Sequence, residues 1–140
     1  MKILFICNSN VGRSQAAEAI FNSQVTDGEI AISAGTIVNE DHGQILKDRP
    51  GAVGMLTALE ELGIDAKEKT RTQLTEGLLE DVEVIVVMAD RDTWPAYLAK
   101  DPRLVVWEVP LDDITLESSR IARDLIATHI KETFTSNVPN

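Results

Sequence analysis

Ile3-Leu4-Phe5-Ile6-Cys7-Asn8-Ser9-Asn10-Val11-Gly12-Arg13-Ser14 opens the chain with the pattern of a strand, a tight polar loop and the start of a helix. The apolar run has the length of a strand, and residues 15–21 carry apolar side chains at helical spacing. Backbone N–H groups of such a loop converge at a helix N-terminus, which favours an anion such as phosphate and stabilises a thiolate. The stretch therefore predicts an α/β fold with an anion site near its N-terminus.

The residue types in this loop match the needs of phosphoryl transfer to a protein nucleophile. Cys7 is the candidate nucleophile, and Arg13 supplies a planar guanidinium that pairs with two phosphate oxygens. Ser14 is placed to donate its hydroxyl to the sulfur, and Asn10 tolerates the left-handed backbone of a tight loop. A lone cysteine after a strand is most often a small core residue. The Arg-Ser helix start favours the catalytic interpretation.

Residues 6–18, ICNSNVGRSQAAE, resemble the signature of the low-molecular-weight protein tyrosine phosphatase family, which includes related arsenate reductases. Weaker similarities at residues 33–36, 62–65, 73–75 and 84–88 extend the resemblance over most of the chain. The resemblance implies that a cysteine attacks phosphorus and that the arginine and the loop amides hold the phosphate oxygens. The substrate-binding residues that it implies are Asn8, Ser9, Asn10, Val11, Gly12, Arg13 and Ser14.

The resemblance also implies a general acid, an Asp in a loop late in the chain. The corresponding loop, residues 108–114, nominates Asp112 or Asp113, and its spacing slightly favours Asp112. Asp113 can equally cap the final helix. Asp90 and Asp92 are second choices that we expect to cap a helix instead.

Several positions depart from the family pattern. Gly12 stands where many members have a second cysteine, so their protective disulfide is absent, and Ser9 stands where a Gly is common. No aromatic residue lies in residues 36–51 or directly follows the Asp pair. Since a phosphotyrosine slot is usually walled by aromatic rings, selectivity for tyrosine stays open.

Composition limits the class of protein. The 140 residues fit one domain, which we expect at residues 1–134 before a loose tail at 135–140. The net charge of −10 argues against partners such as nucleic acid or an anionic membrane. One cysteine and two histidines exclude a disulfide framework and favour no metal site. No signal peptide or membrane span is predicted, so we expect a cytoplasmic protein.

Alternating patterns predict a single-domain, three-layer α/β/α fold with a four-stranded parallel sheet of the low-molecular-weight phosphatase type. Strands are expected at residues 2–6, 29–33, 82–88 and 104–107, and helices at 13–25, 52–62, 91–99 and 115–134. A short helix is expected at 75–80 and a long loop beside the site at 36–50. The expected core positions of the helices are Ala17, Ile20, Phe21, Met55, Leu56, Leu59, Leu62, Ile121, Leu125, Ile126, Ile130 and Phe134.

With the resemblance, these patterns predict a cysteine-dependent phosphatase that hydrolyses phosphomonoesters through a phosphocysteine, without metal or organic cofactor. The expected partner is a phosphorylated protein, such as one carrying phosphotyrosine, or a small aryl phosphate, and we expect a monomer. Two alternatives stay open. One is an arsenate reductase that uses an external thiol such as glutathione or mycothiol, because one cysteine cannot form an internal relay. The other is a phosphate-binding module without turnover.

Overall fold

Four strands form one parallel sheet in the order β2-β1-β3-β4. The structure is a computed structural model, and it describes residues 1–24, 28–111 and 113–134. The tail predicted at residues 135–140 lies outside the described residues. The strands are β1 (Lys2–Cys7), β2 (Ile30–Gly35), β3 (Val84–Val87) and β4 (Leu104–Val106).

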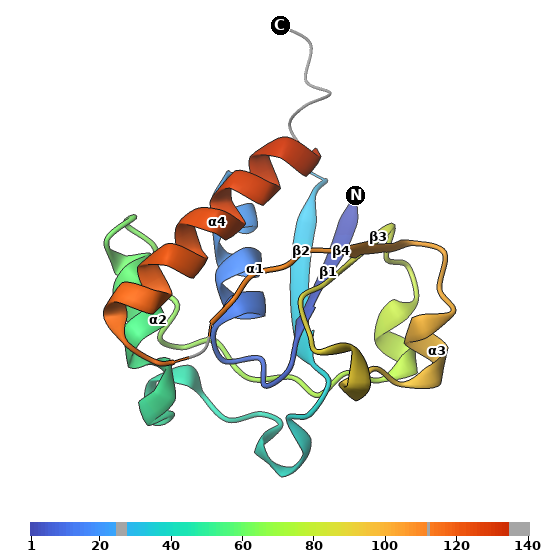
Figure 1. Ribbon diagram of the computed structural model, residues 1–140, viewed down its shortest axis with the longest axis horizontal. Coiled ribbons are helices and arrows are strands. Elements are labelled where there is room, and N and C mark those ends of the chain that lie inside the picture. Colours follow the sequence, from blue (N-terminus) through green and yellow to red (C-terminus); the bar gives the residue numbers. More distant parts are fainter. Residues whose placement is uncertain (25–27, 112, 135–140) are drawn as a thin grey trace, which may run out of the picture.

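Helices cover both faces of the sheet (Figure 1), as the α/β/α prediction requires. One face carries α1 (Arg13–Gln24), α2 (Val53–Glu60) and α4 (Leu116–Phe134). The other face carries the short α3 (Ala96–Ala99) and a 3-10 turn, Glu76–Leu79. Further 3-10 turns lie in the connections, at Asn39–Asp41, Leu46–Asp48, Pro50–Ala52 and Arg91–Thr93. The predicted fold class is confirmed.

Alternation along β1 supplies both halves of the core. Ile3 and Phe5 face α1 and α4, whereas Leu4 and Ile6 face α3, and all four are fully buried. The Phe5 ring contacts three other aromatic rings at centroid distances of 5.6–6.3 Å, those of Phe21, Trp107 and Phe134. Apolar side chains therefore hold β1 rigidly on both faces, and the loop that follows it starts from a fixed position.

Two predicted core positions are wrong. Leu62 is 49% exposed because α2 already ends at Glu60, and the chain turns at Gly63 with a φ of 79°. Ile121 is 62% exposed because the buried stripe of α4 runs through Ala122 and the residues four and eight positions later. A one-residue offset rotates a side chain by about 100° around a helix, which is enough to turn it to solvent.

Several element boundaries also differ from the prediction, and two of the differences lie near the site. The helix expected at residues 91–99 is a 3-10 turn at Arg91–Thr93 followed by α3, and Pro95 separates the two because it lacks an N–H. Strand β2 continues to Gly35 instead of ending at Ser33. This extension pairs Gly35 with Cys7 across the sheet, at the edge where the candidate loop begins.

The topology concentrates the predicted site residues at the carboxyl ends of the strands. After β1 the chain forms β2 on one side of it, and then returns to form β3 on the other side. In parallel α/β sheets, ligands bind where the strand order reverses in this way. Cys7 ends β1, and Met88 directly follows β3. No helix in the described part of the chain combines the length and apolar character that a membrane span requires.

Candidate active site

Cys7 ends β1 with its thiol buried against the start of α1. Its side chain is 2% exposed, and its Sγ lies 2.9 Å from Ser14 Oγ. The thiol lines a pocket of about 160 Å³ together with Arg13 and Asp113. The remaining walls of this pocket are Ser9, Val11, Gly12, Gly51, Met55, Leu111, Ile114 and Ser119. Asp112, the other predicted acid, lies outside the described residues.

The carbonyl groups of the loop after Cys7 are held from outside the loop. The carbonyls of Cys7 and Asn8 accept hydrogen bonds from backbone N–H groups at 2.9 Å. The carbonyl of Gly12 accepts from a backbone N–H group in the first turn of α1, also at 2.9 Å. The carbonyls of Ser9 and Asn10 accept from side chains. The donors are Thr36 N, Ile37 N, Ala16 N, the Arg71 guanidinium and the Gln15 amide.

The loop N–H groups are free of protein acceptors. Among the described residues, no backbone N–H from Asn8 to Gly12 donates to a protein atom. Because the C=O and N–H of a peptide point in opposite directions, carbonyls turned outward leave the N–H groups turned toward the inside of the loop. These donors converge at the N-terminus of α1, which itself carries partial positive charge. The loop therefore presents N–H groups of the kind that bind a tetrahedral oxyanion.

Asn10 determines which way the Ser14 hydroxyl points. Asn10 has a φ of 55°, in the left-handed region, and its Nδ2 donates to Ser14 Oγ at 2.7 Å and to Ser33 Oγ at 3.0 Å. Since Ser14 Oγ accepts from this amide, its own hydrogen is available for the Cys7 sulfur. Ser14 can thus donate a hydrogen bond to the Cys7 sulfur, which lies 2.9 Å from its Oγ.

Further hydrogen bonds hold Asn10 itself. Its Oδ1 accepts from Gln15 Nε2 at 3.0 Å and from Thr72 N at 2.8 Å, so both oxygen and nitrogen of the amide are bonded. Ser33 Oγ donates in turn to Glu18 Oε1 at 2.8 Å, and Glu18 forms an ion pair with Lys69. These bonds restrict the Asn10 amide, although Gln15 Oε1 is a buried oxygen without a hydrogen-bond partner among the described residues.

Gly35 lies against the backbone of the loop, which leaves no room for a side chain at this position. A Cβ at this position would lie 2.6 Å from Asn8 O and 2.8 Å from Asn10 N, both of them backbone atoms of the loop. Real Cβ atoms do not approach backbone so closely, so any larger residue must displace the loop or the strand.

Gly35→Ala is expected to destabilise the fold by about 1–3 kcal/mol and to lower phosphate affinity, because the loop backbone must move. The measurement is thermal unfolding with and without phosphate. The matched control is Gly77→Ala, because a Cβ at Gly77 would meet nothing closer than 3.9 Å. Equal unfolding temperatures for the two variants would contradict the steric argument.

Arg13 is held by carbonyl groups at the ends of two strands. Its Nη1 donates to Met88 O at 2.8 Å and to Val109 O at 3.4 Å. Its Nε and Nη2 donate to no atom of the described residues. These two N–H groups form the edge of a guanidinium that pairs with two oxygens of a phosphate. Arg13 therefore carries a pre-oriented pair of donors at the wall of the Cys7 pocket.

Residues 2–97 match the family profile described as Low molecular weight phosphotyrosine protein phosphatase. The chain belongs to this family. It is an enzyme of the cysteine-based phosphatase class, a phosphoric monoester hydrolase, as the resemblance of its loop implied. Among curated proteins, no sequence matches this phosphatase.

Solved structures share the fold of this phosphatase at low sequence identity. SP-PTP, a low molecular weight protein tyrosine phosphatase from Streptococcus pyogenes, is 20% identical with a TM-score of 0.78, over 99% of this chain and 94% of that one. The YwlE arginine phosphatase from Geobacillus stearothermophilus is 24% identical with a TM-score of 0.74, over 93% and 88%. An arsenate reductase in the phosphate binding state is 22% identical with a TM-score of 0.74, over 94% of each chain.

Asp113 of this phosphatase lines the Cys7 pocket and also supports the start of α4. Its Oδ1 accepts from Thr115 N at 3.0 Å and from Thr115 Oγ1 at 2.7 Å, while Thr115 Oγ1 accepts from Ser118 N and so acts as the cap. The Thr115 hydroxyl, followed by the Thr115 amide, holds the pKa of Asp113 below its usual range. Asp113 therefore favours the ionised form, which cannot donate a proton.

Asp90 does not cap the segment that follows it, in contrast to the prediction. Its carboxylate accepts from Asn8 Nδ2 at 2.9 Å, and its N–H donates to Asn8 Oδ1 at 2.8 Å, so no side-chain bond caps the turn at Arg91–Thr93. This pair of bonds connects the ends of β1 and β3. Asp92 is exposed and makes no side-chain cap either.

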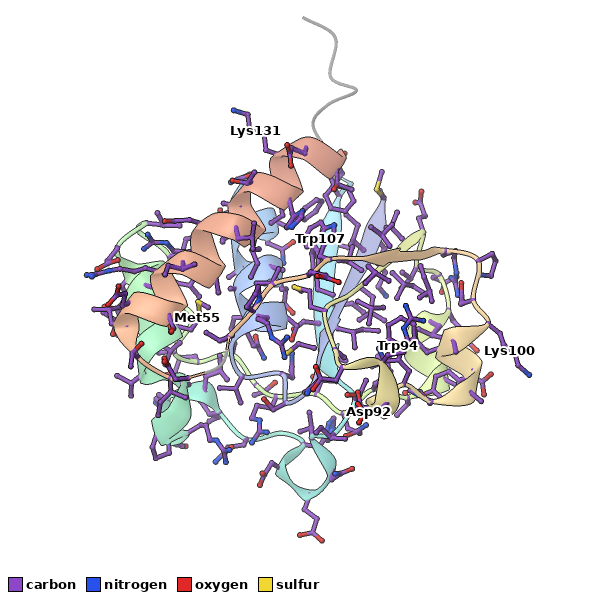
Figure 2. All side chains as sticks on the ribbon, in the orientation of Figure 1. Met55, Asp92, Trp94, Lys100, Trp107 and Lys131 are labelled. Atoms are coloured by element: carbon purple, nitrogen blue, oxygen red, sulfur yellow. The ribbon has the colours of Figure 1, made fainter. Side chains whose placement is uncertain are left out.

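A larger cleft of about 600 Å³ adjoins Arg13 on the side of β3 and β4. Trp94 lines it, with the Arg91 guanidinium 4.5 Å above the Trp94 ring, and Trp107 lines it as well. Figure 2 shows Trp94 near α3 and Trp107 beside α4. The aromatic residues that line this cleft therefore follow β3 and β4, whereas residues 36–51 contain none.

The histidines have structural contacts. His42 Nδ1 accepts from Gln73 N at 2.9 Å, and the His129 ring stacks on Trp107 at 4.9 Å. Within residues 1–24, 28–111 and 113–134, no cluster of three or more His, Cys, Asp or Glu side chains could hold a metal ion.

Sequence reasoning missed three residues that hold the loop of this phosphatase: Gln15, Gly35 and Arg71. Gln15 carried a usable signal, because a polar residue in the first turn of a helix after such a loop can reach back to it. Gly35 lies in the weak family similarity at residues 33–36, which does not indicate that a loop packs against it. Arg71 lies 62 residues beyond the Ser9 carbonyl that it contacts, so no local pattern marks it.

Proposed function

We propose that the protein hydrolyses phosphomonoesters through a phosphocysteine intermediate. Cys7 Sγ attacks phosphorus in line, so an S–P bond forms while the ester P–O bond breaks. The general acid gives its proton to the leaving oxygen. Water then attacks phosphorus, the S–P bond breaks, phosphate leaves, and the proton returns to the acid. The observation that carries this proposal is a buried Cys7 thiol beside a loop whose N–H groups from Asn8 to Gly12 have no acceptor among the described residues, while the carbonyls of residues 7–10 and of Gly12 accept hydrogen bonds.

Arg13 and the loop from Asn8 to Ser14 hold the phosphate in this proposal. The N–H groups and the free edge of Arg13 contact the equatorial oxygens, where charge is concentrated in the transition state. Ser14 donates to the Cys7 sulfur and stabilises it both as attacking thiolate and as leaving group. Every role thus has a named protein group, so the mechanism needs no metal or organic cofactor.

For the general acid we infer Asp112, because Asp113, the other Asp that the sequence nominates, is engaged elsewhere. Thr115 donates twice to Asp113 and lowers its pKa, whereas an acid must hold its proton until the leaving group departs. Asp113 then serves the start of α4 and contributes negative charge at the pocket wall.

Asp112→Asn is expected to lower kcat by about 10²-fold or more for an ester with a poor leaving group, because no proton is supplied. In the wild type, kcat should fall at alkaline pH as the acid ionises, and this limb should vanish in Asp112→Asn. The measurement is a pH profile of kcat for phenyl phosphate. The adjacent control, Asp113→Asn, should keep the alkaline limb, because a carboxyl with a lowered pKa is already ionised there. An alkaline limb lost only in Asp113→Asn would reverse the assignment.

The substrate class that we propose is an aryl phosphomonoester, either phosphotyrosine in a protein or a small aryl phosphate. The pocket at Cys7 has apolar walls that include Val11, Met55 and Leu111, which suit an uncharged ring. Leu111 also borders the larger cleft, where a polypeptide around a phosphorylated residue can lie. We further infer a cytoplasmic monomer, since a reducing compartment keeps the single thiol active.

The experiment is hydrolysis of p-nitrophenyl phosphate before and after treatment with iodoacetamide. Cys7 is the sole cysteine, so alkylation reports on it alone. We expect turnover that alkylation abolishes, and inorganic phosphate should slow the alkylation. A panel of phosphotyrosine peptide, phenyl phosphate and phosphoarginine then distinguishes the substrate classes, because one structural neighbour is named an arginine phosphatase. Turnover that survives full alkylation would refute the phosphocysteine mechanism.

Arsenate reduction is the second candidate, favoured by the fold shared with an arsenate reductase in the phosphate binding state. Cys7 would displace an oxygen of arsenate to form a thiol adduct of As(V). An external thiol would attack the Cys7 sulfur, which releases As(III) and leaves a mixed disulfide, and a second thiol would reduce that disulfide. Arsenite formation from arsenate and glutathione or mycothiol, without ester hydrolysis, would select this candidate. Phosphate binding without either reaction would indicate a binding module.

A further inference from the structure

Arg71 is a buried cation in contact with the loop after Cys7, residues 8–14, which we call the anion loop. Its side chain is 2% exposed, although an arginine is rarely buried without a specific use. It lies in the segment that runs between the long loop and the sheet, just after the Ile45–Thr70 bridge and just before the Gly35–Gln73 bridge. This segment contacts the loop after Cys7 through Arg71, which donates to Ser9 O, and it contacts the start of α1 through Thr70 O, which accepts from Gln15.

The guanidinium of Arg71 divides its donors between two loops. Its Nε and Nη2 both donate to Ser9 O, at 3.1 and 3.0 Å. Its Nη1 donates to Gln44 Oε1 at 2.8 Å and lies 3.2 Å from Asp41 Oδ2. Arg71 thus joins the anion loop to the long loop at residues 36–50.

The Ser9 carbonyl differs from the other carbonyls of the loop in the kind of group that donates to it. The carbonyls of Cys7, Asn8 and Gly12 accept from backbone amides, and that of Asn10 accepts from a neutral side chain. Within the described residues, a charged side chain holds only the Ser9 carbonyl. Hydrogen bonds from ionised donors are stronger than neutral ones, so this is the most firmly held carbonyl of the loop.

The hydrogen bonds from Arg71 to Ser9 O fix the orientation of the peptide between Ser9 and Asn10. The Ser9 C=O and the Asn10 N–H belong to one planar peptide and point in opposite directions. A carbonyl fixed toward Arg71 therefore fixes the Asn10 N–H toward the inside of the loop. The same peptide leads into Asn10, whose φ of 55° is disfavoured for residues other than glycine. Rotation of this peptide would relieve Asn10 and would remove one donor from the anion.

The buried charge has a second effect. Among the described residues, the carboxylate that pairs with Arg71 is that of Asp41, which is 52% exposed and therefore also accessible to water. The Arg71 charge is therefore only partly neutralised, and burial reduces its screening by salt. A positive charge on the outer side of the loop adds to the potential that attracts an anion to the inner side.

We propose that Arg71 is a positioning residue of the anion loop: it fixes the Ser9–Asn10 peptide so that the Asn10 N–H faces the phosphate, and it couples this peptide to the loop at residues 36–50. The proposal rests on the proposed function for the identity of the anion. It concerns phosphate binding and the reactivity of Cys7, neither of which requires turnover.

The experiment compares Arg71→Met and Arg71→Lys with Arg103→Met. Arg103 is the control because its guanidinium also donates to backbone carbonyls, in this case Leu79 O and Val82 O, and pairs with a carboxylate, that of Asp101, away from the loop after Cys7. Two quantities are measured for each variant: the dissociation constant of inorganic phosphate by titration calorimetry, and the rate of Cys7 alkylation by iodoacetamide between pH 5 and 9. Thermal unfolding records the loss of stability.

We expect Arg71→Met to weaken phosphate binding by about tenfold to a hundredfold and to change the pH profile of alkylation, because a displaced donor loses its geometry. Arg71→Lys keeps the charge without the paired donors and should weaken binding several-fold, with near wild-type stability. Arg103→Met should lose stability while it keeps the wild-type affinity and alkylation profile. If Arg71→Met does not fold, Arg71→Lys decides the question.

Wild-type phosphate affinity in a folded Arg71→Lys together with a wild-type alkylation profile would overturn the proposal. Equal losses of phosphate affinity in the Arg71 and Arg103 variants would also overturn it, because the effect would then be one of stability alone. Failure of the proposed function is recorded separately, as wild-type protein that binds phosphate but does not hydrolyse p-nitrophenyl phosphate.

Discussion

Cys7→Ser is expected to lower kcat for p-nitrophenyl phosphate by about 10⁴-fold or more. A serine hydroxyl is not ionised near neutral pH, and no base of the described residues lies at hydrogen-bond distance from position 7. The group at hydrogen-bond distance from the Cys7 sulfur is Ser14 Oγ, 2.9 Å away, and Asn10 Nδ2 donates to that oxygen, which leaves the Ser14 hydrogen directed to position 7. Ser14 can donate a hydrogen bond to the atom at position 7 but cannot remove a proton from it.

Phosphate binding provides the internal control for Cys7→Ser. The loop N–H groups and Arg13 are unchanged, and a serine oxygen is smaller than the sulfur, so the dissociation constant of phosphate should stay within about threefold of the wild-type value. The measurement combines initial rates with titration calorimetry. Residual turnover above about a hundredth of wild type would mean that another group attacks phosphorus. A parallel loss of phosphate affinity would mean that the variant has lost the loop conformation.

Local patterns were sufficient for the parts of the site that are contiguous in sequence. Residues 3–14 hold the strand, the loop and the helix start, and the order of residue types follows from the needs of one anion. The left-handed backbone of Asn10 and the bond between Ser14 and Cys7 were predictable because both partners lie within this short stretch. The four parallel strands were predictable for the same reason, since each has its own apolar run.

Contacts between distant segments could not be predicted in this way. Arg71 reaches Ser9 across 62 residues, and Asn8 reaches Asp90 across 82. Asp90 was expected to cap a helix because an Asp before a helical segment usually does so. In the fold its carboxylate meets Asn8 instead, because the ends of β1 and β3 are neighbours. Tertiary contact overrode the local preference, and only the strand order reveals it.

Arg13→Lys is expected to lower kcat/KM for p-nitrophenyl phosphate by about 10³-fold, although it keeps the positive charge. Nη1 of Arg13 holds Met88 O and Val109 O, while Nε and Nη2 remain as a parallel pair of donors. One ammonium group cannot hold two carbonyls behind it and present two coplanar donors in front, so the lysine must give up one of these tasks. Loss of a single oriented donor at a transition-state oxygen already costs about 10²–10³ in rate.

The comparison variant is Arg103→Lys, which makes the same change at an arginine away from the loop after Cys7, where it should leave kcat/KM unaltered. Steady-state kinetics on both variants, with phosphate as a competitive inhibitor, separates charge from geometry. If charge alone attracts the phosphate, Arg13→Lys will keep kcat/KM within about tenfold of wild type, because the Coulomb interaction of two unit charges depends on distance and not on donor direction. If the paired donors matter, kcat will fall much more than phosphate affinity, since their alignment is worth most when the equatorial oxygens spread into the plane of the transition state.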